Sequence, residues 1–303
     1  MLLEVNHLRI EFKRDGKLLV PVRDVSFSVP KHGRVALVGE SGCGKSLSAL
    51  SLMRLPPVDR ATLSGEIKFS GKKISYVFQN PSDALNPVMK IQDQIKEAIE
   101  RKFSSKELKE HIYSLLSRTG LENPERIAKS YPCELSGGQQ QRCMIAMALA
   151  ADPDLIVADE PTTALDVTTQ KQVIELMDSL ASETGMAILL ITHNLGLVAG
   201  CMDEVNVMYA GSVVESGKVV EVLKNPKHPY TKGLLDAVPR LDAPRNAKLA
   251  DIKGTVPPPD KWPNGCVFAD RCPYAVDECR KDEPQYIKIK DGSSHRWKCC
   301  VCS

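Results

Sequence analysis

The sequence predicts an α/β fold with an N-terminal antiparallel β-subdomain, a helical insertion and a small, irregular, cysteine-rich C-terminal extension. Three observations lead to this prediction. Residues 34–52 have the pattern of a strand, a glycine-rich loop and a helix. Later apolar runs such as Leu155–Ala158 are strand-sized and end in polar residues, as buried parallel strands do. From Ile91 to about Ser130 the apolar residues recur instead with helical spacing.

Composition narrows the possible classes of protein. The 303 residues carry a net charge of +2 without a long basic run, which argues against nucleic acid as a partner. The N-terminus lacks a signal-peptide pattern, and no apolar run reaches the ~18–20 residues of a membrane span. We therefore expect a cytoplasmic protein that reaches a membrane only through a partner. Six of the ten cysteines lie in the last 38 positions, which suggests metal ligands rather than disulfides.

The first 29 residues alternate apolar and polar side chains and predict β-strands. Asp15-Gly16 predicts a hairpin turn between two of these strands. Phe12 lies on a strand ahead of the glycine-rich loop, where its ring could stack on an adenine base. The alternative that Phe12 is only a core residue of the sheet is equally compatible with its spacing.

The glycine-rich loop, Gly39-Glu40-Ser41-Gly42-Cys43-Gly44-Lys45-Ser46, matches the pattern G-x-x-x-x-G-K-[ST] at every fixed position. Its glycines allow the backbone N–H groups to point at phosphate oxygens, and the following helix directs its positive end at the same anion. Lys45 would reach the β- and γ-phosphates, and the Ser46 hydroxyl would bind Mg²⁺. The loop predicts that the chain binds a nucleoside triphosphate.

Two further strands are expected at Gly65–Phe69 and Ile74–Phe78, with Gln79 at the end of the second. Ligand groups collect at the carboxyl ends of strands in such sheets, so Gln79 is a candidate site residue. The helical insertion follows. It ends at a second anion-binding nest formed by Ser136 and two glycines at a helix start. One nucleotide does not need two nests in one domain, so this second nest favours a head-to-tail dimer that sandwiches nucleotide.

The apolar strand Leu155–Ala158 leads into two adjacent carboxylates, Asp159 and Glu160. Strand alternation points their side chains in opposite directions, so we expect them to have different roles. Asp159 suits Mg²⁺ binding, directly or through water, and Glu160 suits the activation of an attacking water as general base.

Three elements complete the core. A long helix is expected from Asp166 to about Ser182. Ala187–Thr192 is a further core strand, and His193 at its end could hydrogen-bond a γ-phosphate. Residues 205–209 and 212–215 are expected to form a closing hairpin.

Together and in this order, the motifs resemble those of the nucleotide-binding subunits of ABC transporters, over residues 1 to about 225. The resemblance implies a P-loop NTPase (ABC ATPase) core at 1–227, with a helical subdomain at about 88–150, that hydrolyses ATP with Mg²⁺. Asn194 departs from the pattern, since the family usually has an acid there. The matched segments are Gly39–Ser46 (Walker A), Gln79 (Q-loop), Leu135–Gln139 (signature), Asp154–Glu160 (Walker B), Ala164–Asp166 (D-loop) and His193 (switch histidine).

The resemblance also implies residue roles. The catalytic residues would be Glu160, His193, Gln79 and Lys45, and the Mg²⁺ ligands would be Ser46, Gln79 and Asp159. Residues 80–87 would receive a helix of a membrane subunit. The implied nucleotide contacts are Phe12, Gly39, Glu40, Ser41, Gly42, Cys43, Gly44, Lys45, Ser46, Leu47, Gln79, Ser136, Gly137, Gly138, Gln139, Asp159 and Asp166.

A narrower resemblance concerns residues 228–303, a C-terminal extension that is similar to that of oligopeptide, dipeptide and nickel importer ATPases. It is carried by Asn225–Leu235 and by the spacing Cys266-x5-Cys272-x6-Cys279. The resemblance implies a peptide importer subunit at the cytoplasmic face of the cell membrane. Its partners would be integral permease subunits, a second ATPase subunit in a homo- or heterodimer, and indirectly a solute-binding protein. Uptake of nickel or another small solute, a soluble ATPase of the same superfamily, and an ATP-regulated redox or metal sensor are the alternatives.

The cysteine spacing of the extension favours a 4Fe–4S cluster. Cys266, Cys272 and Cys279 are separated by five and six residues, whereas zinc ribbons typically space their ligands by two to four. Widely spaced thiolates suit a larger inorganic core, and the family resemblance points the same way. For the fourth ligand we choose Cys299, because residues 295–299 match the His-x-x-x-Cys ending of the subfamily; Cys300 and Cys302 are the alternatives. A zinc site or free thiols remain open.

Overall fold

The computed structural model describes residues 1–303 except 56–60, 164, 239–250, 289–292 and 303. The described residues form two compact units. Unit 1 comprises residues 1–29, 34–69 and 191–303, and unit 2 comprises residues 30–33 and 70–190. The sequence-based division into 1–227 and 228–303 stays a prediction, because these units group residues by packing and not by sequence family.

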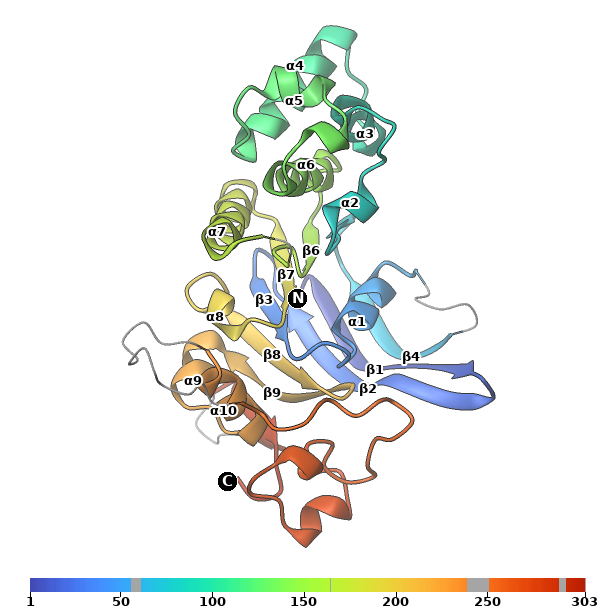
Figure 1. The fold of residues 1–303 in the computed structure, drawn as a ribbon, viewed down its shortest axis with the longest axis vertical. Helices are drawn as coiled ribbons and strands as arrows, with labels where there is room; N and C mark the ends of the chain where they lie inside the picture. The colour runs from blue at the N-terminus through green and yellow to red at the C-terminus, as the bar shows by residue number, and fades with distance from the viewer. Residues whose placement is uncertain (56–60, 164, 239–250, 289–292, 303) are drawn as a thin grey trace. The chain divides into compact units, whose positions relative to one another are not determined.

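Unit 1 begins with the expected antiparallel β-subdomain (Figure 1). Strand β1 (Leu3–Arg14) pairs with β2 (Lys17–Val29) on one side and with β4 (Thr62–Phe69) on the other. The turn between β1 and β2 is the predicted Asp15-Gly16, and both residues have positive φ, 51° and 76°. Such angles suit the tight turns that join twisted antiparallel strands.

The rest of unit 1's main sheet places the glycine-rich loop. Strand β3 (Arg34–Val38) lies parallel to β8 (Glu204–Tyr209), and β8 forms the predicted hairpin with β9 (Ser212–Lys218). β9 in turn pairs with β2. Four of the five β3 residues are fully buried. The loop after β3 therefore starts from a rigid core strand, and helix α1 (Lys45–Leu52) continues from it.

The C-terminal part of unit 1 contains several short regular elements, some of them in the extension that the sequence predicts to be irregular. Short helices α8 (Leu195–Val198), α9 (Val219–Lys224) and α10 (Pro229–Asp236) follow β7 and the β8–β9 hairpin. Two 3-10 turns, η2 (Ala269–Arg271) and η3 (Asp277–Arg280), lie in or at the end of residues 266–279. These residues contain Cys266, Cys272 and Cys279 and are called the cysteine segment below. Strand β11 (Arg296–Lys298) pairs with β10 (Tyr286–Lys288) and also with β9. The sequence analysis missed these last two strands.

A buried polar cluster fastens β11 to β9. His295 Nε2 lies 2.7 Å from Glu215 Oε1, and both side chains are almost completely buried. The Glu215 carboxylate also accepts the backbone N–H groups of Lys227 and His228, at 2.7 and 3.0 Å. These hydrogen bonds hold the pKa of Glu215 below its usual value, although burial by itself would raise it. Three segments of the chain thus converge on one carboxylate.

Unit 2 contains three strands in the order β7-β6-β5: β5 (Ile74–Val77), β6 (Leu155–Asp159) and β7 (Ala187–Thr192), whose last residues belong to unit 1. β5 and β6 are parallel, and every residue of β6 is buried, as its apolar sequence predicts. Helix α7 (Val167–Thr184) lies between β6 and β7 in the sequence, where the long helix is expected.

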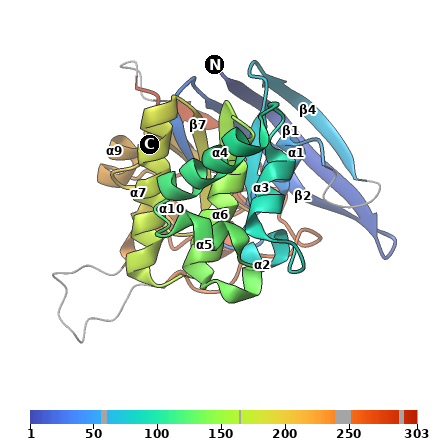
Figure 2. The same ribbon diagram turned by 90° about the horizontal axis from the view of Figure 1, so that it is seen from above.

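The helical insertion of unit 2 is confirmed, and Figure 2 shows its helices gathered together. It comprises α2 (Pro81–Ala84), α3 (Ile91–Ala98), α4 (Ser105–Arg118), α5 (Pro124–Lys129), the 3-10 turn η1 (Pro132–Glu134) and α6 (Gly137–Ala150). Ser104 starts α4 with a reciprocal capping box to Glu107, and Ile112, Leu115 and Leu116 form the helix's buried face. None of the described helices combines the length and apolar composition needed to cross a bilayer.

Candidate functional site

The glycine-rich loop of unit 1 depends on glycine at two positions. Gly44 has φ +98°, and an added Cβ would lie 2.6 Å from the carbonyl oxygen of Pro21. At Gly39 an added Cβ would lie only 2.2 Å from the carbonyl oxygen of Met208, at the end of β8. Larger residues would therefore displace the loop from the strands that hold it.

Lys45, the first residue of α1, is buried within this loop. Its Nζ donates hydrogen bonds to the carbonyl oxygens of Gly39 at 2.7 Å and Glu40 at 3.0 Å. Ser46 follows on the first turn of α1, and no side chain caps this helix. An ammonium group and the N-terminal end of an uncapped helix are what a bound phosphate requires.

Cys43 lies inside the same loop and is fully buried. Burial raises the pKa of its thiol, and the nearby Lys45 ammonium only partly opposes that effect. Cys43 therefore stays a protonated, apolar packing residue.

His193 follows β7 on the side of unit 1. The carbonyl oxygen of Thr192 accepts the backbone N–H of Gly39 at 3.3 Å, so the end of β7 is fastened to the start of the loop. His193 is the next residue and its side chain is exposed. His193 thus directly follows a residue that is hydrogen-bonded to the loop, and its expected contact with a γ-phosphate stays a prediction.

The other strand-end residues belong to unit 2. Asp159, at the end of β6, accepts a hydrogen bond from the hydroxyl of Tyr76 on the neighbouring strand β5, at 2.8 Å. Burial and the negative charge of Asp159 raise the pKa of Tyr76, so the phenol stays protonated and acts as the donor. Tyr76 therefore fixes the carboxylate's orientation.

Glu160 has different partners. Its Oε2 accepts hydrogen bonds from Thr163 Oγ1 at 2.9 Å and from Gln79 Nε2 at 3.3 Å. The residue is 9% exposed and has φ +44°, a left-handed conformation that costs energy for a residue with a side chain. The two adjacent carboxylates thus have different hydrogen-bond donors, and the different roles expected of them stay a prediction.

Two predicted contact residues cap helices. Ser136 caps α6: its hydroxyl accepts the N–H of Gln139, whose side chain accepts the N–H of Ser136. Ser136 and Gly137 are exposed at this helix start. Asp166 caps α7 through the N–H groups of Thr168 and Thr169. Ala164, of the expected D-loop, lies outside the described residues.

Phe12, the expected adenine-stacking residue, lies on β1 opposite Leu19 of β2 and is partly exposed. Its exposure is compatible with a ligand contact, and its strand position is compatible with a role in the sheet. Phe12 therefore stays a candidate.

The cysteines of the extension lie close enough to influence one another. Burial raises the pKa of Cys266 to about 12, and Cys300, Cys279 and Cys299 add to this as neighbouring thiolates. Burial also raises the pKa of Cys272, and Cys299 and Cys279 add to this effect. Cys279 and Cys299 thus lie near both Cys266 and Cys272. Cys300 lies beside Cys279, and Cys302 lies beside Cys299.

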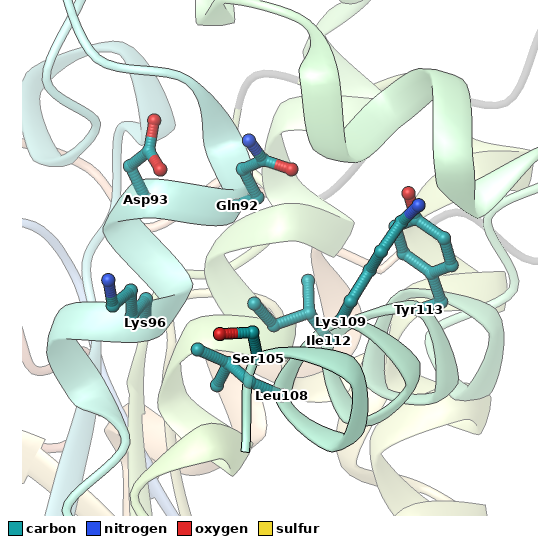
Figure 3. A pocket seen from close by; sticks show the side chains of 8 residues that line it. All are labelled: Gln92, Asp93, Lys96, Ser105, Leu108, Lys109, Ile112 and Tyr113. Atoms are coloured by element: carbon teal, nitrogen blue, oxygen red, sulfur yellow. The ribbon is translucent and has the colours of Figure 1, made fainter. Parts of the chain in front are cut away.

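Within the described part of the chain, no three His, Cys, Asp or Glu side chains are arranged to hold a metal ion. The expected iron–sulfur cluster and Mg²⁺ ligands therefore stay predictions. A hollow of about 200 Å³ lies between α3 and α4 (Figure 3), and none of the predicted site residues lines it. It is lined by Gln92, Asp93, Lys96, Ser105, Leu108, Lys109, Ile112 and Tyr113.

The structure adds four residues that the sequence analysis did not single out. Tyr76 and Thr163 orient the two carboxylates of unit 2. In unit 1, Tyr230 and Arg271 contact Glu40 of the glycine-rich loop, at 2.8 and 2.9 Å. Tyr76 could have been found from its position on the strand before Gln79. The contact between Arg271 and Glu40 joins residues 231 positions apart and has no local signal.

Comparisons with known proteins agree with these motifs. A family model described as ABC transporter matches residues 22–163, and one described as oligopeptide/dipeptide transporter, C-terminal region, matches residues 214–279. The oligopeptide transport ATP-binding protein AppD of Bacillus subtilis is 44% identical over 314 residues, covering 97% of this chain and 95% of AppD. A putative peptide import ATP-binding protein of Brucella ovis is 44% identical over 324 residues, covering 97% and 96%.

The fold has a counterpart among solved structures. The ATP-binding cassette MJ0796, in a dimeric post-hydrolysis state bound to ADP and Pi, covers 72% of this chain with 98% of its own length, at a TM-score of 0.62 and 26% identity. The chain belongs to the ABC transporter family, as one of its ATP-binding, ATP-hydrolysing subunits. Within that family it carries the C-terminal region of the oligopeptide/dipeptide type.

Proposed function

We propose that this subunit powers the import of peptides, working with integral permease subunits and a second ATP-binding subunit at the cytoplasmic face of the cell membrane. The support comes from relatives named for oligopeptide transport and for peptide import that align with 97% of the chain, including the extension. Nickel or another small solute is the alternative cargo. The choice of cargo belongs to the permease and solute-binding subunits, so it is tested in the assembled transporter.

The test of cargo is uptake. In vesicles containing the assembled complex, ATP should drive accumulation of a labelled dipeptide or oligopeptide. Accumulation of Ni²⁺ without peptide would reassign the cargo and leave the ATPase role intact. A chain that neither assembles with permeases nor supports any uptake would contradict the importer role itself.

For the nucleotide we propose that the loop 39–46 holds the phosphates, with the Lys45 ammonium on the β- and γ-phosphates. The Ser46 hydroxyl and Asp159 would hold Mg²⁺, which neutralises phosphate charge when it is bound. Hydroxyl and carboxylate oxygens are ligands that Mg²⁺ prefers. Tyr76 orients the Asp159 carboxylate, since it donates a hydrogen bond to it and retains its own proton. Ser136 and Gly137 would contact the nucleotide of a second subunit.

We assign the role of general base to Glu160, and the environment of its carboxylate is the observation that carries this assignment. Two donors, Thr163 and Gln79, hold one oxygen of the carboxylate, and the backbone is in a left-handed conformation. Strain of this kind clusters at sites where geometry matters for function. Held in this way, the carboxylate can accept a proton from a water that attacks the γ-phosphate.

The substitution Glu160→Gln tests this role. It keeps the size and hydrogen-bonding capacity of the side chain but removes the base, so ATP hydrolysis by the assembled complex should fall ~10²-fold or more while Mg-ATP still binds. Glu175→Gln, on the exposed side of α7, is the matched control and should hydrolyse normally. Near-normal turnover by Glu160→Gln would remove Glu160 from the role.

For the extension we propose a structural 4Fe–4S cluster on Cys266, Cys272, Cys279 and Cys299. It is supported by the position of Cys279 and Cys299, which lie near enough to raise the pKa of both Cys266 and Cys272. Two backbone N–H groups, of Val301 and Cys302, also point at Cys299 Sγ, at 3.4 and 3.2 Å. Hydrogen bonds to sulfur are typical of iron–sulfur sites. Cys300 and Cys302 remain alternative fourth ligands, and zinc remains an alternative metal.

Elemental analysis tests this proposal. Protein purified without oxygen should contain iron and acid-labile sulfide in a ratio of about one to one, and both should be lost in Cys272→Ser. Cys133→Ser, an exposed cysteine of the helical insertion, is the control and should retain both. Stoichiometric zinc without sulfide would refute the cluster. An intact cluster in Cys299→Ser would move the fourth ligand to Cys300 or Cys302.

A further inference from the structure

Arg271 connects the cysteine segment to the glycine-rich loop. It lies between Cys266 and Cys272, directly before the second of these cysteines, and its side chain is only 7% exposed. The guanidinium group has five N–H donors in a rigid plane. Here it donates to Glu40 Oε2 at 2.9 Å and to the hydroxyl of Tyr209 at 3.4 Å. Three carbonyl oxygens accept its remaining donors, those of Ile252, Lys253 and Gly254, at 3.0, 2.9 and 3.1 Å.

Glu40, the acceptor of this ion pair, is the second residue of the glycine-rich loop 39–46, which is called the phosphate loop below. Its backbone is held as well as its side chain. Its N–H donates to the hydroxyl of Tyr230 at 2.8 Å, and its carbonyl oxygen accepts from Lys45 Nζ at 3.0 Å. The position of Glu40 is thus set by α10 and by the cysteine segment together.

Aromatic packing fixes the segment that presents Arg271. The ring of Phe268, two residues after Cys266, lies 5.1 Å from the ring of Tyr209 and 5.4 Å from that of Tyr230. Tyr209 and Tyr230 are themselves 4.7 Å apart. These centroid distances are those of favourable aromatic pairs. The segment that carries Arg271 is therefore packed against Tyr209 and Tyr230 through Phe268.

Charge explains why a phosphate loop needs this contact. A carboxylate on the loop repels the phosphate groups that the loop binds, and repulsion within a partly buried site is only weakly screened. An arginine that pairs with the carboxylate cancels its charge and holds it in one rotamer. Lysine would supply the charge but could not satisfy this set of acceptors, because it lacks the planar array of five donors.

We propose that Arg271 is a positioning residue for the phosphate loop: it neutralises and fixes Glu40, so that nucleotide affinity depends on the folded cysteine segment. The inference rests on the proposed function of residues 39–46 in nucleotide binding. It assigns a role in that binding to the C-terminal extension, through a residue that does not touch nucleotide.

A double-mutant cycle on the full-length chain tests the proposal, with Mg-ATP affinity as the readout. Arg271→Ala should raise the Kd about tenfold, because it leaves Glu40 charged and unpaired beside the phosphates. The same substitution in the Glu40→Gln background should change the Kd less than about twofold, since no charge is left to neutralise. Arg271→Lys should lie between Arg271→Ala and the wild type. Arg280→Ala is the matched control, because Arg280 directly follows the same segment and forms an exposed ion pair with Asp270, and it should bind normally.

Hydrolysis by the assembled complex supplies a second readout. Arg271→Ala should raise the KM for ATP while kcat stays within about twofold, because Arg271 positions the loop and does not touch the reacting atoms. An unchanged Kd in Arg271→Ala would overturn the proposal. So would an equal loss in both Glu40 backgrounds, which would mean that Arg271 acts only through the stability of the extension. If Arg271→Ala does not fold, Arg271→Lys in the two backgrounds decides the same question. A wild-type chain that binds no Mg-ATP would instead refute the proposed function.

Discussion

At the scale of single residues, buried polar side chains stabilise the packing of the C-terminal part of unit 1. Glu215 collects hydrogen bonds from His295 and from two backbone N–H groups. His228, one of the residues whose N–H it accepts, is itself buried and caps α10 by accepting the N–H of Tyr230 at 3.1 Å. Such groups stabilise the fold only in one protonation state, so they make its stability depend on pH.

His228 leads to a pH prediction. Burial lowers its pKa from 6.5 to about 4, and the charge of Glu215 opposes this only in part. Below pH 6.5 His228 is protonated in the unfolded chain, whereas in the folded chain it becomes protonated only near pH 4. Stability from this residue is therefore complete above pH 6.5 and is lost as the pH falls towards 4, by about 3 kcal/mol at most.

Urea unfolding at several pH values between 4.5 and 6.5 measures this slope. Glu215, whose pKa is lowered, loses its contribution only at pH values below its ordinary 4.5, so this window isolates the histidine. His228→Asn retains a helix-capping side chain and should unfold with a flatter pH dependence. An equal slope in His228→Asn would assign the effect to other groups.

At the scale of elements, β11 is a short strand whose role depends on one large side chain. Trp297 pairs with Glu215 across β9 and β11 and is 3% exposed. Its indole N–H donates to the carbonyl oxygen of Cys302 at 2.7 Å, and its ring lies 5.4 Å from that of His295. The indole thus packs β11 and also fixes the last residues of the described chain.

Replacement of this side chain should release the end of the extension. Trp297→Ala should cost about 3–5 kcal/mol in the stability of the tail and expose residues 293–302 to protease or to hydrogen exchange. Tyr274→Ala is the control, because Tyr274 is 57% exposed in the same extension and its removal should cost little. Unchanged protection of residues 293–302 in Trp297→Ala would show that the strand pairing with β9 suffices without the ring.

The elements also show how far sequence reasoning extends. Strands β3, β6 and β7 were predicted because each is a short apolar run, and the phosphate loop because its glycines have fixed spacing. Strands β10 and β11 have three residues each, and the partner of β11 outside its own hairpin is β9, about 80 residues away. The spacing of apolar residues along the chain does not indicate such a long-range pairing. Tyr76, Thr163 and Arg271 were missed for a similar reason, since their roles lie in contacts rather than in patterns.

At the scale of the whole molecule, the order of the motifs was more informative than any motif by itself. It predicted the α/β fold, the helical insertion and the family, and the comparisons confirm the family. The sequence did not indicate that residues after 191 pack in one unit with the phosphate loop. That association depends on buried contacts such as those of Arg271, Tyr230 and His295, which join distant parts of the chain.

The burial of Cys43 has a chemical consequence for a protein with ten cysteines. Oxidants and alkylating reagents attack the thiolate and need access to sulfur. Cys43 offers neither, because its pKa is raised and its side chain has no exposed surface. Cys133 and Cys300 are exposed. Oxidative damage to this subunit should therefore begin at the exposed thiols, while the Cys43 thiol inside the glycine-rich loop stays reduced.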